Sequence, residues 1–266
     1  MSNTMTDVLL KRDRRIVVAA LVLLTALAWV FLLRHVRSMP VAAAPIPEMP
    51  GMDMSAAMIR TWTPGDLVVL FPMWAIMMVA MMTPSVTPMI LIYARVARQF
   101  VEERRPLAAT GWFTAGYLLS WTAFSLVAAI AHSLLERSGW LNPIMAPASV
   151  SVAGTMLIIA GLYQFTPLKN NCLGHCKSPL TFLETHGGFK PGMVASMKVG
   201  IRHGLYCIGC CWALMALLFA GGVMNVFWIV AISTHLVIEK MLMAGHVIAR
   251  LTGAVLAIAG LWLIFK

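Results

Sequence analysis

Long apolar stretches separated by short polar segments occupy most of the chain. Seven of them contain roughly 16 to 27 residues, and most therefore approach the length that an α-helix needs to cross a lipid bilayer. The pattern predicts spanning helices at residues 16–33, 67–93, 110–135, 150–165, 204–220, 226–243 and 247–265. The boundary between the last two is the least distinct, because few polar residues interrupt residues 226–265.

The composition agrees with this pattern. Hydrophobic residues make up 60% of the sequence and charged residues 11%, and the mean hydropathy is +0.84. These values are typical of integral membrane proteins rather than soluble domains. We therefore expect an all-α fold, a polytopic helical membrane protein with about seven transmembrane helices (six to seven) surrounded by the lipid bilayer.

The basic residues predict the orientation of the chain. The net charge of +10 does not indicate a nucleic-acid partner, because Lys and Arg lie in short clusters between the apolar stretches. With the predicted helices, fifteen of the 20 fall on one side, and the five others are Arg34, Arg37, Arg60, Arg137 and Lys266. Since Lys and Arg accumulate in cytoplasmic loops, the amino terminus is predicted to be cytoplasmic.

The first apolar stretch has two interpretations. A basic segment at residues 11–15, an apolar run and small residues at 42–44 are also features of a signal peptide. The run is long for a signal peptide, and basic residues separate it from the small ones, so a retained helix is favoured. The expected regions are an amino-terminal transmembrane helix at 1–37, an external Met-rich loop at 38–63, and a six-helix metal-binding membrane domain at 64–266 with a cytoplasmic Cys/His loop at 168–193.

Four side chains of metal-ligand type recur at helical spacing within residues 203–211. At 100° per residue, His203, Cys207, Cys210 and Cys211 fall within an arc of roughly 100° on one helix. Cys210 and Cys211 each lie about one turn from Cys207. A packed core seldom requires three thiols and an imidazole on one stripe, whereas these groups suit a soft metal such as Cu(I) or Zn. We therefore predict a metal site here.

Methionines in the external loop are a second candidate. Met49, Met52 and Met54 lie in a Pro-rich segment where they have little reason to pack. A thioether binds soft copper without losing a proton, so the loop is a candidate copper contact. The simpler interpretation is a loop that rests on the membrane interface through flexible apolar side chains.

A third group lies on the second predicted helix. Met73, Met77 and Met81 repeat at four-residue spacing, and Met78 and Met82 form a second stripe further around the helix. The five side chains cover about half of the circumference, so they cannot all face one path. Adaptable packing beside a Pro-bent helix explains at least some of them, while one stripe is predicted to line an internal metal site.

The predicted cytoplasmic loop contains a further set of soft ligands. Cys172, His175 and Cys176 lie within five residues, and thiols in the reducing cytoplasm stay free for metal or exchange chemistry. A second cysteine cluster about thirty residues later in the sequence strengthens this interpretation.

His235 and Glu239 lie one turn apart on the sixth predicted helix. The predicted topology places them at the depth of Cys207, and a carboxylate inside a membrane is a functional candidate by default. They are therefore predicted to join the metal site. The alternative is an interfacial ion pair of Glu239 with Lys240 or Arg202.

Three stretches resemble a bacterial family of predicted metal-binding integral membrane proteins, a domain of unknown function. They are the Met-rich segment at 73–84, the segment at 198–212 that contains the three cysteines, and Glu239-Lys240. The resemblance covers roughly residues 62–266. It implies a multi-helix fold in the bacterial cytoplasmic (inner) membrane and metal binding, but no particular reaction.

These features favour a copper-handling membrane protein. Methionines lie in the external loop and along the second predicted helix, and Cys, His and Glu lie toward the cytoplasmic side. This arrangement predicts Cu(I) transport or delivery, with a copper-carrying or copper-accepting protein as partner. Zn also suits the Cys/His set. A thiol–disulfide electron carrier based on Cys207 and Cys210 is the first alternative, and a structural subunit, in which glycines allow close helix packing, is the second. No catalytic or nucleotide-binding motif is visible, so an enzyme is not expected. The sequence leaves a homo-oligomer open.

Overall fold

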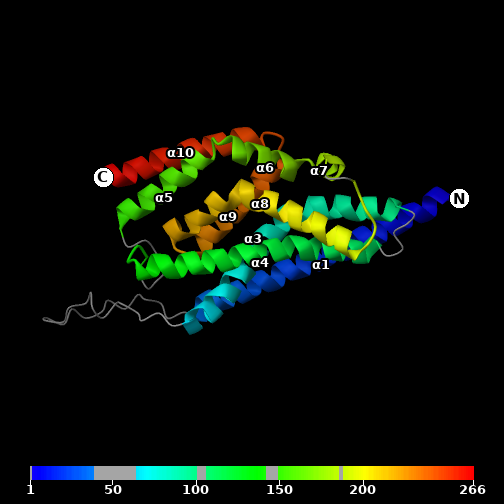
Figure 1. Cartoon of the computed structure of the whole chain (residues 1–266), viewed down its shortest axis with the longest axis horizontal. Coiled ribbons are helices and arrows are strands. Elements are labelled where there is room, and N and C mark those ends of the chain that lie inside the picture. Colours follow the sequence, from blue (N-terminus) through cyan, green and yellow to red (C-terminus); the bar gives the residue numbers. More distant parts are fainter. Residues whose placement is uncertain (1, 39–63, 101–105, 142–148, 186–187) are drawn as a thin grey trace.

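The computed structural model describes residues 2–38, 64–100, 106–141, 149–185 and 188–266. The regular elements within these ranges are nine helices (Figure 1). They are α1 (Ser2–Ser38), α3 (Pro64–Gln99), α4 (Pro106–Arg137), α5 (Val150–Tyr163), α6 (Pro167–Lys177), α7 (Pro179–Thr185), α8 (Met193–Gly221), α9 (Val226–Met241) and α10 (Gly245–Phe265). The all-helical prediction is confirmed. Met49, Met52 and Met54 lie outside the described residues.

The described residues contain five or six helices that could span a membrane, compared with the six to seven predicted. Within the described residues, α1, α3, α4, α8 and α10 are long and apolar enough to cross a membrane. The pair α5 and α6 makes a sixth span only if both are counted together, and the chain bends by 66° between them. At 1.5 Å per residue, the 16 residues of α9 reach only about 24 Å, short of a bilayer core of about 30 Å.

The long helices pack in a chain of neighbours. Contacts join α1 to α3, α3 to α4, and α4 to α8, while α5 and α10 form a separate pair that meets the rest through α8 and α9. Glycines allow the closest of these contacts: a Cβ at Gly161 would lie 2.7 Å from the Gly253 carbonyl oxygen. The two chain termini lie at opposite ends of the bundle (Figure 1).

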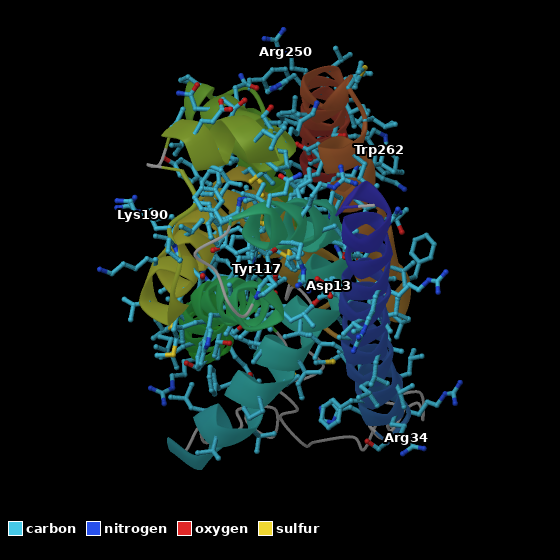
Figure 2. All side chains as sticks on the ribbon, turned by 90° about the vertical axis from the view of Figure 1, so that its right-hand side faces the viewer. Asp13, Arg34, Tyr117, Lys190, Arg250 and Trp262 are labelled. Atoms are coloured by element: carbon cyan, nitrogen blue, oxygen red, sulfur yellow. The ribbon has the colours of Figure 1, made fainter. Side chains whose placement is uncertain are left out.

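The interior of the bundle is apolar and rich in sulfur. Met77, Met78, Met81 and Met82 are all fully buried, so both methionine stripes of α3 face protein. The outer surface is apolar along α10, where Leu251, among others, is exposed. Charged side chains such as Arg34, Lys190 and Arg250 project outward, whereas Tyr117 lies inside (Figure 2).

The segment predicted as a Cys/His loop is largely helical. Thr166 precedes α6 and its side chain accepts a hydrogen bond from the Lys169 amide nitrogen at 3.3 Å. Pro167 follows in the first turn. Thr followed by Pro is a typical start of a helix, because the hydroxyl caps a free amide and proline needs no amide partner there. The resulting helix holds Cys172 and Cys176 one turn apart on a fixed scaffold.

Candidate metal centre

One face of α8 carries the cysteine–histidine stripe. His203, Cys207, Cys210 and Cys211 are all buried, as expected for residues that share one side of a helix. This face packs against α4, where small residues allow the two backbones to approach; for example, a Cβ at Gly204 would lie 2.6 Å from the Ser120 Cβ. The stripe is therefore held inside the protein and does not face the surroundings.

A cysteine from α6 completes a group of three sulfur atoms. α6 packs across α8 and brings Cys176 Sγ to 3.8 Å from Cys210 Sγ, although the two residues are 34 positions apart in the sequence. The sulfurs of Cys176, Cys207 and Cys210 all lie within 4.8 Å of one another. Across the described ranges, no other group of three His, Cys, Asp or Glu ligand atoms is this close.

The donor set of this sulfur trio (Cys176, Cys207 and Cys210) favours a soft metal. Thiolate sulfur selects Cu(I) or Zn over hard cations, which prefer oxygen. Structural zinc sites are almost always closed by four ligands. The trio offers three, and no fourth His, Cys, Asp or Glu ligand atom joins it among the described residues. Three sulfurs without an oxygen ligand therefore fit Cu(I) better than structural zinc.

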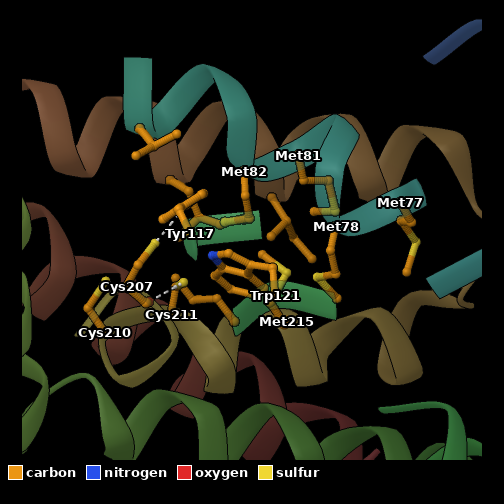
Figure 3. Packing of buried hydrophobic residues seen from close by; sticks show 14 of the residues in the cluster. Met77, Met78, Met81, Met82, Tyr117, Trp121, Cys207, Cys210, Cys211 and Met215 are labelled. Carbon is orange, nitrogen blue, oxygen red and sulfur yellow. Dashed lines mark hydrogen bonds between the residues drawn. The ribbon is translucent and has the colours of Figure 1, made fainter. Parts of the chain in front are cut away.

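Two polar side chains hold Cys207 from other helices. The Tyr117 hydroxyl of α4 lies 3.2 Å from Cys207 Sγ. The Lys240 ammonium of α9 donates to the same sulfur at 2.9 Å and to Ser85 Oγ of α3 at 3.2 Å. A cationic neighbour favours the thiolate, the form of cysteine that binds metal. Figure 3 shows Tyr117 and the α8 cysteines gathered at one end of the methionine cluster.

The comparison with known families agrees with this chemistry. Residues 71–263 match a family described as PpoB2, copper chaperone. The chain belongs to this family. The matched span includes all five cysteines of the chain together with Tyr117 and Lys240. No curated protein and no solved structure is detectably similar to this PpoB2-family chain.

The two remaining cysteines of the PpoB2-family chain flank the sulfur trio. Cys211 donates to the Cys207 carbonyl oxygen at 2.8 Å. Cys172 Sγ lies against the backbone of α8, where a Cβ at Gly209 would come within 2.7 Å of it. All five thiols are free, and the two on α6 approach α8 at Gly209 and Cys210. The structure therefore joins two cysteine clusters that are separate in the sequence.

Two of the three histidines predicted as ligands, His203 and His175, lie beside the sulfur trio but outside it. The His203 ring packs among the rings of Phe113, Tyr117 and Phe182, at centroid distances of 6.1, 6.0 and 5.0 Å. The His175 ring stacks on Tyr206 at 4.4 Å. Their aromatic contacts give both rings a packing role, and metal binding by either stays a prediction.

Glu239 pairs with Lys169 and His235 in the structure, and metal binding by Glu239 or His235 stays a prediction. Glu239 Oε1 pairs with Lys169 Nζ of α6 at 2.6 Å, and Glu239 Oε2 lies 3.5 Å from His235 Nε2. The ion-pair partner of Glu239 is therefore Lys169 and not Lys240 or Arg202. Lys240 contacts Cys207 of the sulfur trio instead. Successive residues on a helix point about 100° apart, so Glu239 and Lys240 reach different neighbours.

The methionines of α3 lie close to the cysteines but within the packed core. Met73, Met77 and Met81 are buried, and the cluster also contains Trp121 of α4 and Met215 of α8 (Figure 3). Burial is compatible with both adaptable packing and a metal route, so copper contact by these thioethers stays a prediction.

Lys240 and Tyr117 are the functional candidates that sequence reasoning missed. Glu239-Lys240 stood out as a motif, but the sequence pattern gave Lys240 only the role of an ion-pair partner. Tyr117 carries no local signal, because its contact with Cys207 spans 90 residues. Both roles arise from the packing of α4 and α9 around α8.

Proposed function

We propose that this PpoB2-family protein is an integral membrane protein that binds Cu(I) through Cys176, Cys207 and Cys210 and delivers or transports it. The single observation that carries the proposal is the convergence of three sulfur atoms within 4.8 Å. Membership of a copper chaperone family supports copper as the cargo. A copper-carrying or copper-accepting protein is the partner that such a role requires.

The proposed location is the bacterial cytoplasmic membrane, with the amino terminus in the cytoplasm. Five long apolar helices and the exposed apolar face of α10 support insertion, and the uneven distribution of Lys and Arg supports the orientation. In this orientation the sulfur trio lies toward the cytoplasmic side, with the buried methionines between it and the external loop. Resistance of the protein to extraction from membranes by alkaline carbonate tests insertion, and release would contradict it.

Thiol–disulfide exchange is the second candidate function. The 3.8 Å separation of Cys176 Sγ and Cys210 Sγ favours it, because two thiols this close are candidates for oxidation to a disulfide. Copper handling is preferred because Cys207 and the buried ammonium of Lys240 lie next to this pair. Thiol–disulfide exchange requires neither of them. We propose no catalytic turnover for the protein.

Elemental analysis of detergent-purified protein, expressed with and without added copper, tests the proposal. The wild type should hold about one Cu(I) per chain, since the three sulfurs form one soft site. Replacement of Cys176, Cys207 and Cys210 by Ser together should remove the metal. The matched control replaces the flanking Cys172 and Cys211 by Ser and should retain it. A copper-free wild type that forms mixed disulfides with a partner would favour the exchange function instead.

A further inference from the structure

The three cysteine residues of the trio differ in exposure. Cys207 and Cys210 are 1% and 2% exposed, whereas Cys176 is only partly buried. An acceptor protein that takes copper must place its own sulfur within bonding distance of the metal. Two sulfurs enclosed by protein offer no room for such an approach, so exchange has to begin on the side of Cys176.

The three sulfurs also differ in how they are anchored. Cys207 is held by Tyr117 and Lys240, and Cys210 Sγ donates to the Cys207 carbonyl oxygen at 3.1 Å. In the part of the chain that the structure describes, Cys176 Sγ has no contact with a hydroxyl or an ammonium group. Its polar neighbours are the other two sulfurs of the trio, with Cys210 Sγ at 3.8 Å. Cys176 is therefore the sulfur that can change partner with the least disturbance of its surroundings.

The helices that carry the sulfurs add to this difference. Cys207 and Cys210 lie in the middle of α8, a 29-residue helix packed closely against α4. Cys176 lies one residue before the end of α6, which has 11 residues and is bent by 66° away from α5. The last turn of a short helix opens locally more readily than the middle of a long packed one.

We propose that Cys176 is the exchange ligand of the site, through which copper reaches and leaves the buried pair Cys207 and Cys210. The inference rests on the proposed function and names the residue at which the partner acts. In unloading, the bonds from Cu(I) to the buried sulfurs break while a bond to the acceptor's thiolate forms, so that copper passes through a state bound by Cys176 and the acceptor. The bond to Cys176 then breaks as a second thiolate of the acceptor binds the metal. The two protons that the acceptor thiols gave up pass to Cys176 and Cys210, while Cys207 stays a thiolate beside Lys240. Copper stays Cu(I) throughout.

Stopped-flow removal of Cu(I) from the detergent-purified, copper-loaded chain by bathocuproine disulfonate, a soluble Cu(I) chelator, tests the proposal. Cys176→Ser should keep copper occupancy near that of the wild type, because the buried pair remains. Its release rate should fall by about tenfold or more, since the accessible sulfur is lost. Cys176→Met, which restores a soft ligand at the same position, should recover much of the rate.

Cys211→Ser is the matched control, because Cys211 is buried on the same helix face but outside the trio. It should leave the release rate unchanged. Unchanged release from Cys176→Ser, equal slowing in Cys211→Ser, or loss of copper from Cys176→Ser would each overturn the exchange role. Failure of the wild type to bind Cu(I) would instead overturn the proposed function, so the two failures are distinguishable.

Discussion

Lys240 places a buried positive charge beside the sulfur trio. Its side chain is 9% exposed, and its ammonium lies 2.9 Å from Cys207 Sγ. A buried charge is costly unless an opposite charge and hydrogen bonds compensate it. Cys207 as a thiolate supplies that charge, and a Cu(I) ion bound by the three thiolates of the trio carries a net charge of −2, so a negative charge faces the ammonium in both states. Lys240 therefore suits both the empty and the loaded site.

Replacement of Lys240 by Met should weaken Cu(I) binding. The substitution keeps most of the length of the side chain but removes its charge and its hydrogen bonds to Cys207 and Ser85. Loss of a partner that supports a metal ligand typically lowers affinity by about 10- to 100-fold, and we expect a decrease in this range. Competition titration with bicinchoninate measures it. Lys240→Arg keeps the charge and should lower the Cu(I) affinity less than Lys240→Met does. Wild-type affinity in Lys240→Met would contradict the role of Lys240 as a counter-charge.

Residues that share one helix were predictable, and residues that meet across helices were not. The stripe at His203 to Cys211 follows from helical periodicity alone, so its burial on one face was expected. Cys176 was recognised as a soft ligand on the same side, but its contact with Cys210 depends on how α6 crosses α8. The Lys240 and Tyr117 contacts depend in the same way on tertiary packing.

α6 and α9 are joined by a buried ion pair. The side chains of Lys169 and Glu239 are 0% and 2% exposed, and the Nζ–Oε1 distance is 2.6 Å. Attraction between such charges offsets their lost hydration only while both partners are present. This pair anchors the first turn of α6 to the helix that carries Lys240, about two helical turns before Cys176.

Glu239→Gln should therefore destabilise the protein. It leaves the Lys169 ammonium buried without a counter-charge, which typically costs about 3 kcal/mol or more. Thermal unfolding in detergent should show the loss, and the double variant with Met at both positions should recover most of it. If Glu239→Gln instead lowers copper content at unchanged stability, Glu239 is a metal ligand, as the sequence pattern predicted.

The contact between α4 and α8 depends on glycine. A Cβ at Gly200 would overlap the carbonyl oxygen of Phe113, so Gly200→Ala must push the helices apart. We expect a loss of about 1–3 kcal/mol, as for other overpacked interiors, seen as a lower unfolding temperature. Gly111→Ala on α4 is the control, because nothing lies within 4 Å of its new Cβ. Equal effects of the two substitutions would contradict the close contact.

The helices themselves were easier to predict than their ends. Apolar stretches identified all five long helices, because each is longer than the uncertainty of its boundaries. The helical start at Thr166-Pro167 was overlooked, since the polar residues that follow resemble a loop. α9 was predicted as a full span, because the apolar run continues past its end at Met241.

The molecule as a whole combines an apolar exterior with a sulfur-lined interior. Exposed leucines and valines on α10 suit lipid, while the buried methionines and cysteines offer soft ligands along the inside of the bundle. This division supports a metal-handling protein of the membrane and gives little support to a purely structural subunit, which needs no convergent thiols.

X-ray absorption at the copper edge of the purified, Cu(I)-loaded protein tests the sulfur site most directly. The spectrum should show Cu(I) bound by sulfur alone, two or three atoms in number. Cys207→Ser should lower the sulfur coordination, while Cys211→Ser should leave the spectrum unchanged. Predominant nitrogen or oxygen coordination, or a spectrum that Cys207→Ser does not alter, would contradict the assignment of Cys176, Cys207 and Cys210 as the copper site.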